Sequence, residues 1–412
     1  MRFPYRIYLC MFLLILLIGG LLSASTPAVA ALIGNEGSLA NAVKPYEINP
    51  DSSGMLWVSD YAAGYIWGID AETGEALKYP VGGNPSDARR VGDYLYWADG
   101  EANILGRSNL LGAGDTWNVS SASGFYGTAV DAQGRLWASD AALPDLYRLD
   151  PVQANLCHVT IPDGLWLGYL VYSDGYLWFS DENYLSNKAR LLRLRVSDNH
   201  LDWWVLPLNS SPFGLTVDAE GDLWYANDGF PLGLVELDPE SNSIKTYYLP
   251  KGNKPAMVAF HGGLIWFTEQ GLDSFGMLDP SGIDRPPVSV SKGEANLACK
   301  NDPYHVNESV QVPLNEGQIQ WGSASFPEIY ADGVWNIYQM PEEEADPWGI
   351  AYQGDKIWVI DQGQQVIIRA RLQASVRACK FFDLDKYLYT TNDRWPVSGW
   401  GGHFRGCRSG GG

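Results

Sequence analysis

The sequence predicts an all-β protein, a β-propeller of seven four-stranded antiparallel blades. A motif of turn residue, aliphatic, aromatic, small pair and acid or amide recurs with only slight variation, its aromatic at Trp57, Tyr96, Trp137, Trp178, Trp224, Trp266 and Trp358. The first five steps between these aromatics are 39 to 46 residues, and the last is 92. A Pro, or Phe125 in its place, precedes the aromatic by 11 or 12 residues in six copies. A period near 40 built from short strands is typical of a propeller.

The fifth repeat shows the strands most clearly. Its runs of β-branched, aromatic and aliphatic residues start at Pro212, Leu223, Leu234 and Ile244, and each is bounded by Gly, Pro, Asn or Asp. This pattern predicts antiparallel strands joined by tight turns, and four of them make one blade. We expect the aromatic of the second strand to pack between neighbouring blades.

The N-terminus predicts export. Arg2 and Arg6 lead an apolar run from Ile7 to Leu22, and a small-residue site ends at Ala30, so residues 1–30 read as a secretory signal. The run is nearly long enough to span a bilayer, which leaves an uncleaved anchor open. We therefore expect a secreted, extracytoplasmic chain with a propeller over residues 31–384 and a Gly-rich tail over residues 385–412.

The net charge and the length of the chain limit which partners are expected. Removing the signal leaves 26 basic against 48 acidic residues, a formal charge of −22. Such a surface repels nucleic acid and anionic membrane, so neither is expected as a partner beyond the signal segment. The remaining length suits one closed ring, expected to be a monomer.

Four cysteines remain after export, Cys157, Cys299, Cys379 and Cys407. They permit three disulfide pairings, among which the sequence does not choose. Their spacing does not fit a zinc site.

The long step of 92 residues predicts an insertion in the sixth blade. After a third strand at Ser274–Leu278, residues 283–333 precede an outer strand at Val334–Met340. Gln318–Ser323 weakly imitates the repeat, so an eighth blade is the alternative. Residues 38–43 could add an outer strand to the last blade and close the ring.

Two positions of each hairpin are candidates for a ligand site. The residue after the Pro and the acid lie 13 or 14 residues apart around a Gly turn, so they should be cross-strand neighbours on one face. The candidates are Tyr46, Tyr126, Phe213 and Trp348 after the Pro, and Asp60, Asp99, Asp140, Asp181, Glu269 and Asp361 at the acid. The acids could instead accept N–H groups of their own turns, and the aromatics could pack between blades. A ring of carboxylates would attract a cation, so Mg²⁺ or Ca²⁺ is a possible cofactor.

Segments such as Pro212-Phe-Gly-Leu215, Leu177-Trp-Phe-Ser-Asp181, Ile265-Trp-Phe-Thr-Glu269 and Thr246-Tyr-Tyr-Leu-Pro250 resemble the streptogramin B (virginiamycin B) lyase family of seven-bladed propellers over residues 45–372. A more distant likeness is to gluconolactonase-type calcium propellers. The resemblance implies a magnesium-assisted elimination, with a His just after one Pro as base and a Glu on the paired strand as metal ligand. Glu269 matches the metal position, but Ala256 stands where its blade would need the base.

No post-Pro position is His, so the residue that would act as the base in this family is missing here. A shared fold does not by itself imply a shared function. We expect a secreted propeller that binds a small molecule, glycan or extracellular protein on an acidic and aromatic channel face, without the lyase chemistry. The alternative is a metal-dependent carbon–oxygen lyase or lactone hydrolase with Glu269 as metal ligand.

Overall fold

The computed structural model describes residues 31–39, 44–111, 113–181, 188–252, 254–311, 315–317, 319–341 and 344–371. The predicted signal, the tail over residues 385–412 and the cysteines at 379 and 407 lie outside these residues. Apart from two short 3₁₀ turns, η1 (Gln270–Leu272) and η2 (Pro280–Gly282), the described elements are strands. The prediction of an all-β propeller of antiparallel sheets is confirmed.

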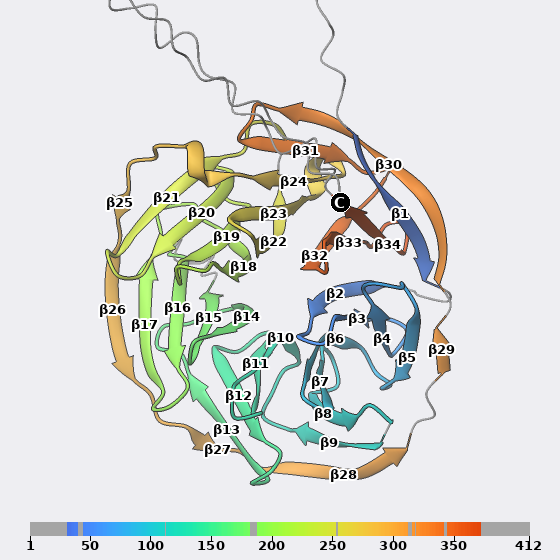
Figure 1. The fold of residues 1–412 in the computed structure, drawn as a ribbon. Helices are drawn as coiled ribbons and strands as arrows, with labels where there is room; N and C mark the ends of the chain where they lie inside the picture. Colours follow the sequence, from blue (N-terminus) through green and yellow to red (C-terminus); the bar gives the residue numbers. More distant parts are fainter. Residues whose placement is uncertain are drawn as a thin grey trace, which may run out of the picture. The chain divides into compact units, whose positions relative to one another are not determined.

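Each Trp-marked hairpin opens a set of antiparallel strands that we call a blade, and these sets succeed one another around a ring (Figure 1). Blade 1 comprises β2 (Pro45–Pro50), β3 (Met55–Asp60), β4 (Tyr65–Asp70) and β5 (Ala76–Pro80). Blade 2 comprises β6 (Pro85–Val91), β7 (Tyr94–Asp99), β8 (Ile104–Asn109) and β9 (Ala113–Val119). Blade 3 comprises β10 (Phe125–Val130), β11 (Leu136–Asp140), β12 (Asp145–Asp150) and β13 (Asn155–Thr160).

The remaining blades continue this order. Blade 4 comprises β14 (Leu167–Ser173), β15 (Tyr176–Asp181), β16 (Arg190–Arg195) and β17 (His200–Val205). Blade 5 comprises β18 (Pro212–Val217), β19 (Leu223–Asn227), β20 (Gly233–Asp238) and β21 (Ser243–Tyr248). Blade 6 comprises β22 (Pro255–His261), β23 (Leu264–Glu269), β24 (Ser274–Leu278) and β31 (Trp335–Gln339). Blade 7 comprises β32 (Pro347–Gln353), β33 (Lys356–Asp361), β34 (Val366–Arg371) and β1 (Ala31–Leu39).

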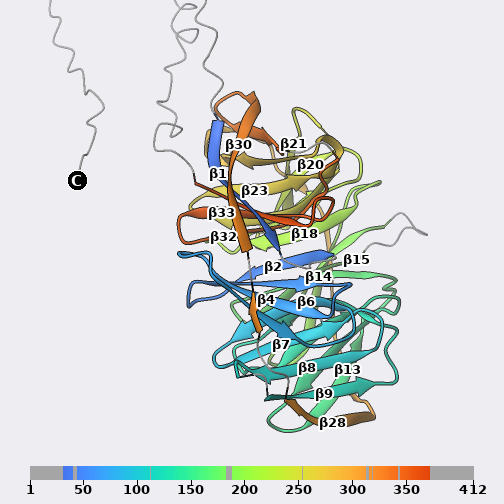
Figure 2. The same cartoon turned by 90° about the vertical axis from the view of Figure 1, so that its right-hand side faces the viewer.

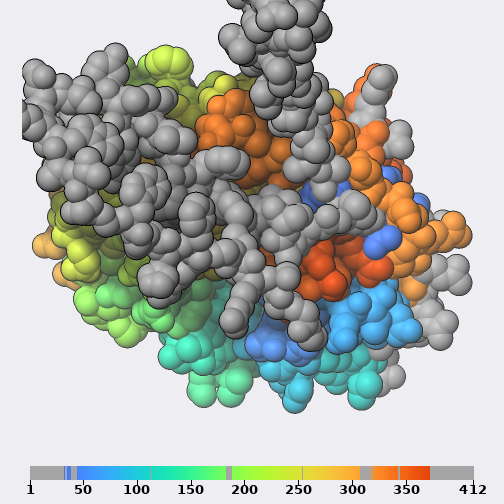
Figure 3. Space-filling view, turned by 45° about the horizontal axis from the view of Figure 1, so that its top comes forward, coloured from blue at the N-terminus to red at the C-terminus, as the bar shows by residue number. Residues whose placement is uncertain are grey.

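The N-terminal strand closes the ring. Residues 33–38 of β1 pair with residues 366–371 of β34, so the outer strand of blade 7 comes from the start of the chain. The sequence placed this strand at residues 38–43, a few residues too late. The inner strands β2 and β32 are in contact, and the first and last blades lie side by side in blue and red (Figure 3).

The segment between β24 and β31 is neither a loop nor an eighth blade. Its strands are spread over the other blades as β25 (Val288–Ser289), β26 (Ser291–Asn296), β27 (Lys300–Asn301), β28 (Tyr304–Gln311), β29 (Asn315–Gly317) and β30 (Ile319–Ala331). In this order they pair with the outer strands of blades 5, 4, 3, 2, 1 and 7. We call residues 288–331 the belt, because they run once around the ring (Figures 1 and 2).

The belt changes the size of the blades. The sequence predicted four strands in each, whereas five sheets have five strands, and blades 6 and 7 share a nine-stranded sheet through β30. The sheets gain a strand because each belt strand forms its backbone hydrogen bonds on the open edge of an existing sheet. The belt strands are two to thirteen residues long.

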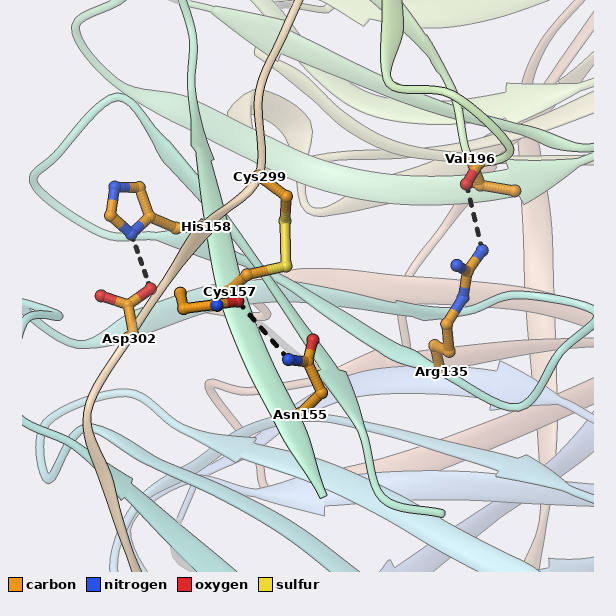
Figure 4. The surroundings of a disulfide bond; sticks show 8 residues. Arg135, Asn155, Cys157, His158, Val196, Cys299 and Asp302 are labelled. Atoms are coloured by element: carbon orange, nitrogen blue, oxygen red, sulfur yellow. Dashed lines mark hydrogen bonds and ion pairs between the residues drawn. A yellow bond between two sulfur atoms is a disulfide. The ribbon is translucent and has the colours of Figure 1, made fainter. Parts of the chain in front are cut away.

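One disulfide fixes the belt to the ring. Cys157 in β13 bonds to Cys299, which directly precedes β27, across a sequence separation of 142 residues (Figure 4). Beside it, His158 Nδ1 lies 2.6 Å from a carboxylate oxygen of Asp302, a second contact between blade 3 and the belt. Of the three pairings that the sequence allowed, the structure therefore contains the one that joins Cys157 to Cys299.

The repeated Trp side chains pack between blades, as predicted. Trp57 contacts a cluster with Leu95 and Trp97 of blade 2, and Trp137 one with Phe179 of blade 4. Burying such a ring contributes a few kcal/mol. In blades 1, 3 and 5 the indole N–H also donates to an Asp six residues earlier, at 2.7 to 2.8 Å.

No helix in the described residues is long and apolar enough to cross a membrane.

Candidate functional site

The two candidate positions of each hairpin lie at one end of the inner strands. In every blade the opening residue pairs with the acid or amide, from Pro45 with Asp60 to Pro347 with Asp361. The register shifts directly after this pair, so a bulge holds the post-Pro residue. The predicted cross-strand relation between the opening of the first strand and the acid is therefore present.

The acids do not face the channel as a ring of carboxylates. Asp60, Asp99, Asp140, Asp181, Glu269 and Asp361 are all at most 3% exposed. Asp140 accepts N–H groups from Ser123, Ala142 and Leu143, each at 2.8 Å. Asp99 accepts three in the same way, and Asn227, which breaks the acidic series, accepts the N–H of Ser211.

The structure thus supports the alternative in which each acid holds its own turns. Hydrogen bonds from backbone N–H groups lower the pKa of a carboxyl group, but they are not the largest effect at Asp140 and Asp361. At both, burial raises the pKa, against the lowering effect of the backbone hydrogen bonds. The acidic face anticipated from the sequence is therefore buried architecture rather than a charged surface.

Two of the acids have further partners. Asp181 forms a buried ion pair with Arg190, whose Nη2 lies 2.5 Å from the carboxylate. Glu269, the candidate metal ligand, accepts a hydrogen bond of 2.8 Å from the hydroxyl of Ser274. Within the described residues, one group of three side chains could converge on a metal ion, and it is His200, Asp202 and Glu294 on β17 and β26, not Glu269. There Lys292 already bonds to Asp202 at 3.0 Å, which opposes a cation.

The post-Pro aromatics, in contrast, come together at the channel mouth. Tyr46 stacks on Trp348 with ring centroids 5.3 Å apart, and Phe213 meets Trp348 edge-on at 5.3 Å. Tyr126 joins them through Tyr169, whose ring lies 4.6 Å from Tyr126 and 5.7 Å from Phe213. The four predicted rings are half-buried, so each keeps part of its surface open. We call Tyr46, Tyr126, Tyr169, Phe213 and Trp348 the aromatic mouth.

Below the aromatic mouth lies a carboxyl group that the sequence did not single out. Glu47, one residue after Tyr46, is 3% exposed and accepts a hydrogen bond of 3.3 Å from the indole of Trp348. Burial, reinforced by the negative charge of Asp87, raises the pKa of Glu47 to about 8. Glu47 is therefore mostly protonated at neutral pH and can donate a hydrogen bond to a ligand or exchange a proton with it.

A polar network continues from Glu47 along the channel. Asp87, fully buried, accepts from the side chain of Asn49 at 2.7 Å and from the N–H and hydroxyl of Thr128 at 2.8 and 3.0 Å. Arg89 lies 3.4 Å from the same carboxylate. These residues come from blades 1, 2 and 3, so the network ties neighbouring inner strands together.

Sequence reasoning missed Tyr169 and Glu47 for different reasons. Blade 4 has Leu167 where other blades have Pro, and Gly168 after it, so its aromatic comes one position late. Glu47 stands at a position occupied elsewhere by Asp87, Gly127, Gly214, Met257 and Gly349, which has no pattern. An acid inside a short strand with buried neighbours was the available signal.

No family model and no curated protein matches the chain. Among solved structures, a catalytically inactive virginiamycin B lyase from Staphylococcus aureus with quinupristin is similar at 18% identity and a TM-score of 0.63, covering 83% of this chain and all of that one. A streptogramin B lyase is similar at 18% identity and 0.62, covering 83% and 98%. The extracellular domain of a hybrid two component system from B. thetaiotaomicron matches at 14% identity and 0.50, covering 84% of this chain and 40% of that one. At these identities the similarity establishes a propeller fold. It does not establish the function, which has to be argued from the residues of the candidate site.

Proposed function

We propose that this protein is a secreted, monomeric binding propeller that takes a small molecule or a glycan on the aromatic mouth. The observation that carries the proposal is the convergence of five aromatic rings from five different blades at one end of the channel. Rings fixed in this way offer apolar faces and edges at low entropic cost, and ligands bind to concave sites of this composition.

The chemistry of the mouth selects among ligands. Its rings would contact an aromatic group or the C–H face of a sugar, while the protonated carboxyl of Glu47 would donate one hydrogen bond at the base. The acids of the hairpins take no part, because they are buried and bond to turn N–H groups or, at Asp181 and Glu269, also to Arg190 and Ser274. An extracellular protein that inserts an aromatic side chain is a further partner compatible with this surface.

Saturation-transfer NMR with p-nitrophenyl glycosides tests the proposal, since these probes carry an aromatic ring and a sugar. Trp348→Ala should weaken binding of any positive probe about ten-fold or more, as expected for a buried aromatic contact. Tyr248→Ala is the matched control, because Tyr248 is 51% exposed on the outer strand of blade 5. Equal binding by wild type and Trp348→Ala would place the ligand elsewhere.

A metal-dependent lyase or lactone hydrolase is the second candidate, and Glu47 favours it. A carboxyl whose pKa is raised to about 8 is suited to acid–base catalysis near neutral pH. Mg²⁺ or Ca²⁺ would have to be held by Glu269 or by groups at the mouth. Incubation of the protein with quinupristin, once in the presence of Mg²⁺ and once in the presence of EDTA, tests this second candidate. The products are identified by mass spectrometry. A ring-opened product that requires Mg²⁺ and is lost in Glu47→Gln supports the enzyme; unchanged quinupristin at high protein concentration counts against it.

A further inference from the structure

A cavity lies at the other end of the inner strands, which start at the aromatic mouth. It has a volume of about 200 Å³ and is lined by residues near the ends of β2, β6, β10 and β14. Its lining includes Arg89, Arg90, Val91, Val130, Val171 and Tyr172. The cavity is therefore distinct from the aromatic mouth and does not depend on the function proposed for it.

Arg89 brings a guanidinium with incomplete hydrogen bonding to this cavity. Its one ion pair in the described residues is the contact of 3.4 Å with Asp87. The oxygens of Asp87 already accept four closer donors, from Asn49, Ala88 and both groups of Thr128, at 2.7 to 3.0 Å. The Nε of Arg89 is buried and has no hydrogen-bond partner among the described residues.

The other charged groups near Arg89 do not fill this place on its guanidinium. Glu47 is mostly protonated near pH 7, because burial raises its pKa to about 8. Arg90, the next residue, is already bonded to Asp51 at 3.1 Å, to Ser53 at 2.6 Å and to the carbonyl of Gly92 at 3.0 Å. A guanidinium with an unused N–H beside a cavity favours an anion.

The cavity walls define the anion further. Val91, Val130 and Val171 contribute apolar side chains to the lining, and Tyr172 adds an aromatic ring. The volume of about 200 Å³ is below the range of pockets for drug-sized ligands, so the occupant is small. Since a guanidinium pairs with a carboxylate through two parallel hydrogen bonds, we propose that this cavity binds a small organic monocarboxylate, its carboxylate on Arg89 and its apolar part against the three valines.

Isothermal titration of the full mature protein at pH 7 in low-chloride buffer tests the site, with benzoate as probe. Benzyl alcohol serves as the uncharged analogue and inorganic phosphate as an anion without an apolar part. We expect saturable benzoate binding, much weaker binding of both other probes, and a loss of about ten-fold or more in Arg89→Gln. Arg195→Gln is the matched control, because Arg195 pairs with Asp198 on the exposed surface of blade 4.

A second variant keeps the proposal testable if Arg89→Gln does not fold. Val171→Phe leaves Arg89 in place and enlarges an apolar side chain of the lining, so it should weaken benzoate more than acetate. Circular dichroism and melting curves confirm that each variant is folded. Benzoate binding that is unchanged in folded Arg89→Gln, or unchanged in Val171→Phe, overturns the proposal, and so does benzyl alcohol binding as tightly as benzoate.

Discussion

Asp140 and Glu47 are both buried carboxyl groups on the inner hairpins, and they differ in whether their position repeats. Asp140 belongs to the repeated series and accepts three backbone N–H groups. Glu47 stands at a position without a pattern and accepts from a side chain, the indole of Trp348. The repeated carboxyl group therefore holds a turn, whereas the unrepeated carboxyl group of Glu47 lies beside the aromatic mouth.

The first way to test this contrast is to remove a repeated ring. Trp137 is fully buried between blades 3 and 4, and its indole donates to Asp131 at 2.8 Å. Trp137→Ala should lower the free energy of unfolding by roughly 3–5 kcal/mol in urea denaturation, through lost packing and a new cavity. Leu208→Ala, at a side chain 66% exposed, should change it by about 0.5 kcal/mol or less. A loss under about 1 kcal/mol at Trp137 would contradict the structural role of the repeat.

The second test concerns the unrepeated belt. Cys157→Ser with Cys299→Ser releases a cross-link over 142 residues of sequence, and long loops are the ones whose closure restricts the unfolded chain most. We expect the double variant to lose about 3 kcal/mol of unfolding free energy, measured against wild type without reductant. Leu208→Ala, at an exposed side chain, is the control and should keep wild-type stability. A double variant as stable as wild type would show that the belt is held by its strand pairing alone.

The third test returns to the repeated acids. Asp140→Ala leaves three turn N–H groups without their acceptor, and partial rehydration limits the expected loss to about 2–3 kcal/mol. Asp140→Asn keeps one acceptor oxygen, as Asn227 does naturally in blade 5, and should lose less than half as much. Chemical denaturation of both variants decides; an equal loss in Asn and Ala would mean that charge, not hydrogen bonding, holds these turns.

The same contrast explains what the sequence could predict. The hairpins were predictable because their period, turn residues and aromatic markers are local and repeated seven times. The packing of Trp57 and Trp137 between blades was predicted from these markers. The belt was not, since β25, β27 and β29 are two or three residues long and take their pairing from sheet edges far away in sequence. A segment of this kind has no periodicity of its own.

The sequence predicted the aromatic part of the candidate site but not the role of its acids. Tyr46, Tyr126, Phe213 and Trp348 do meet, because the residue after the Pro is placed the same way in each hairpin. The acids do not join them, since the sequence gives no measure of whether a carboxylate faces the channel or its own turns. Tyr169, Glu47 and Arg89 were outside the prediction because each depends on contacts between different blades.

The smallest expected effect, and the one that bears most on function, is the pH dependence due to Glu47. Its pKa is raised from 4.5 to about 8 in the folded protein, so between these values the folded state holds a proton that the unfolded state has released. The free energy of unfolding should therefore fall as pH rises through this window, by about 2 kcal/mol between pH 6 and pH 8. Glu47→Gln should flatten this part of the profile and be the more stable protein at pH 8.

Asp222 is the group that has to be separated from this effect. Burial and nearby carboxylates raise its pKa to about 7, which gives a slope of the same sign. Unfolding measured from pH 5 to pH 8.5 in Asp222→Asn, with and without Glu47→Gln, removes that contribution. If the two proteins have parallel profiles above pH 7, Glu47 is ionised in the folded channel. The acid–base role considered for Glu47 would then lose its support.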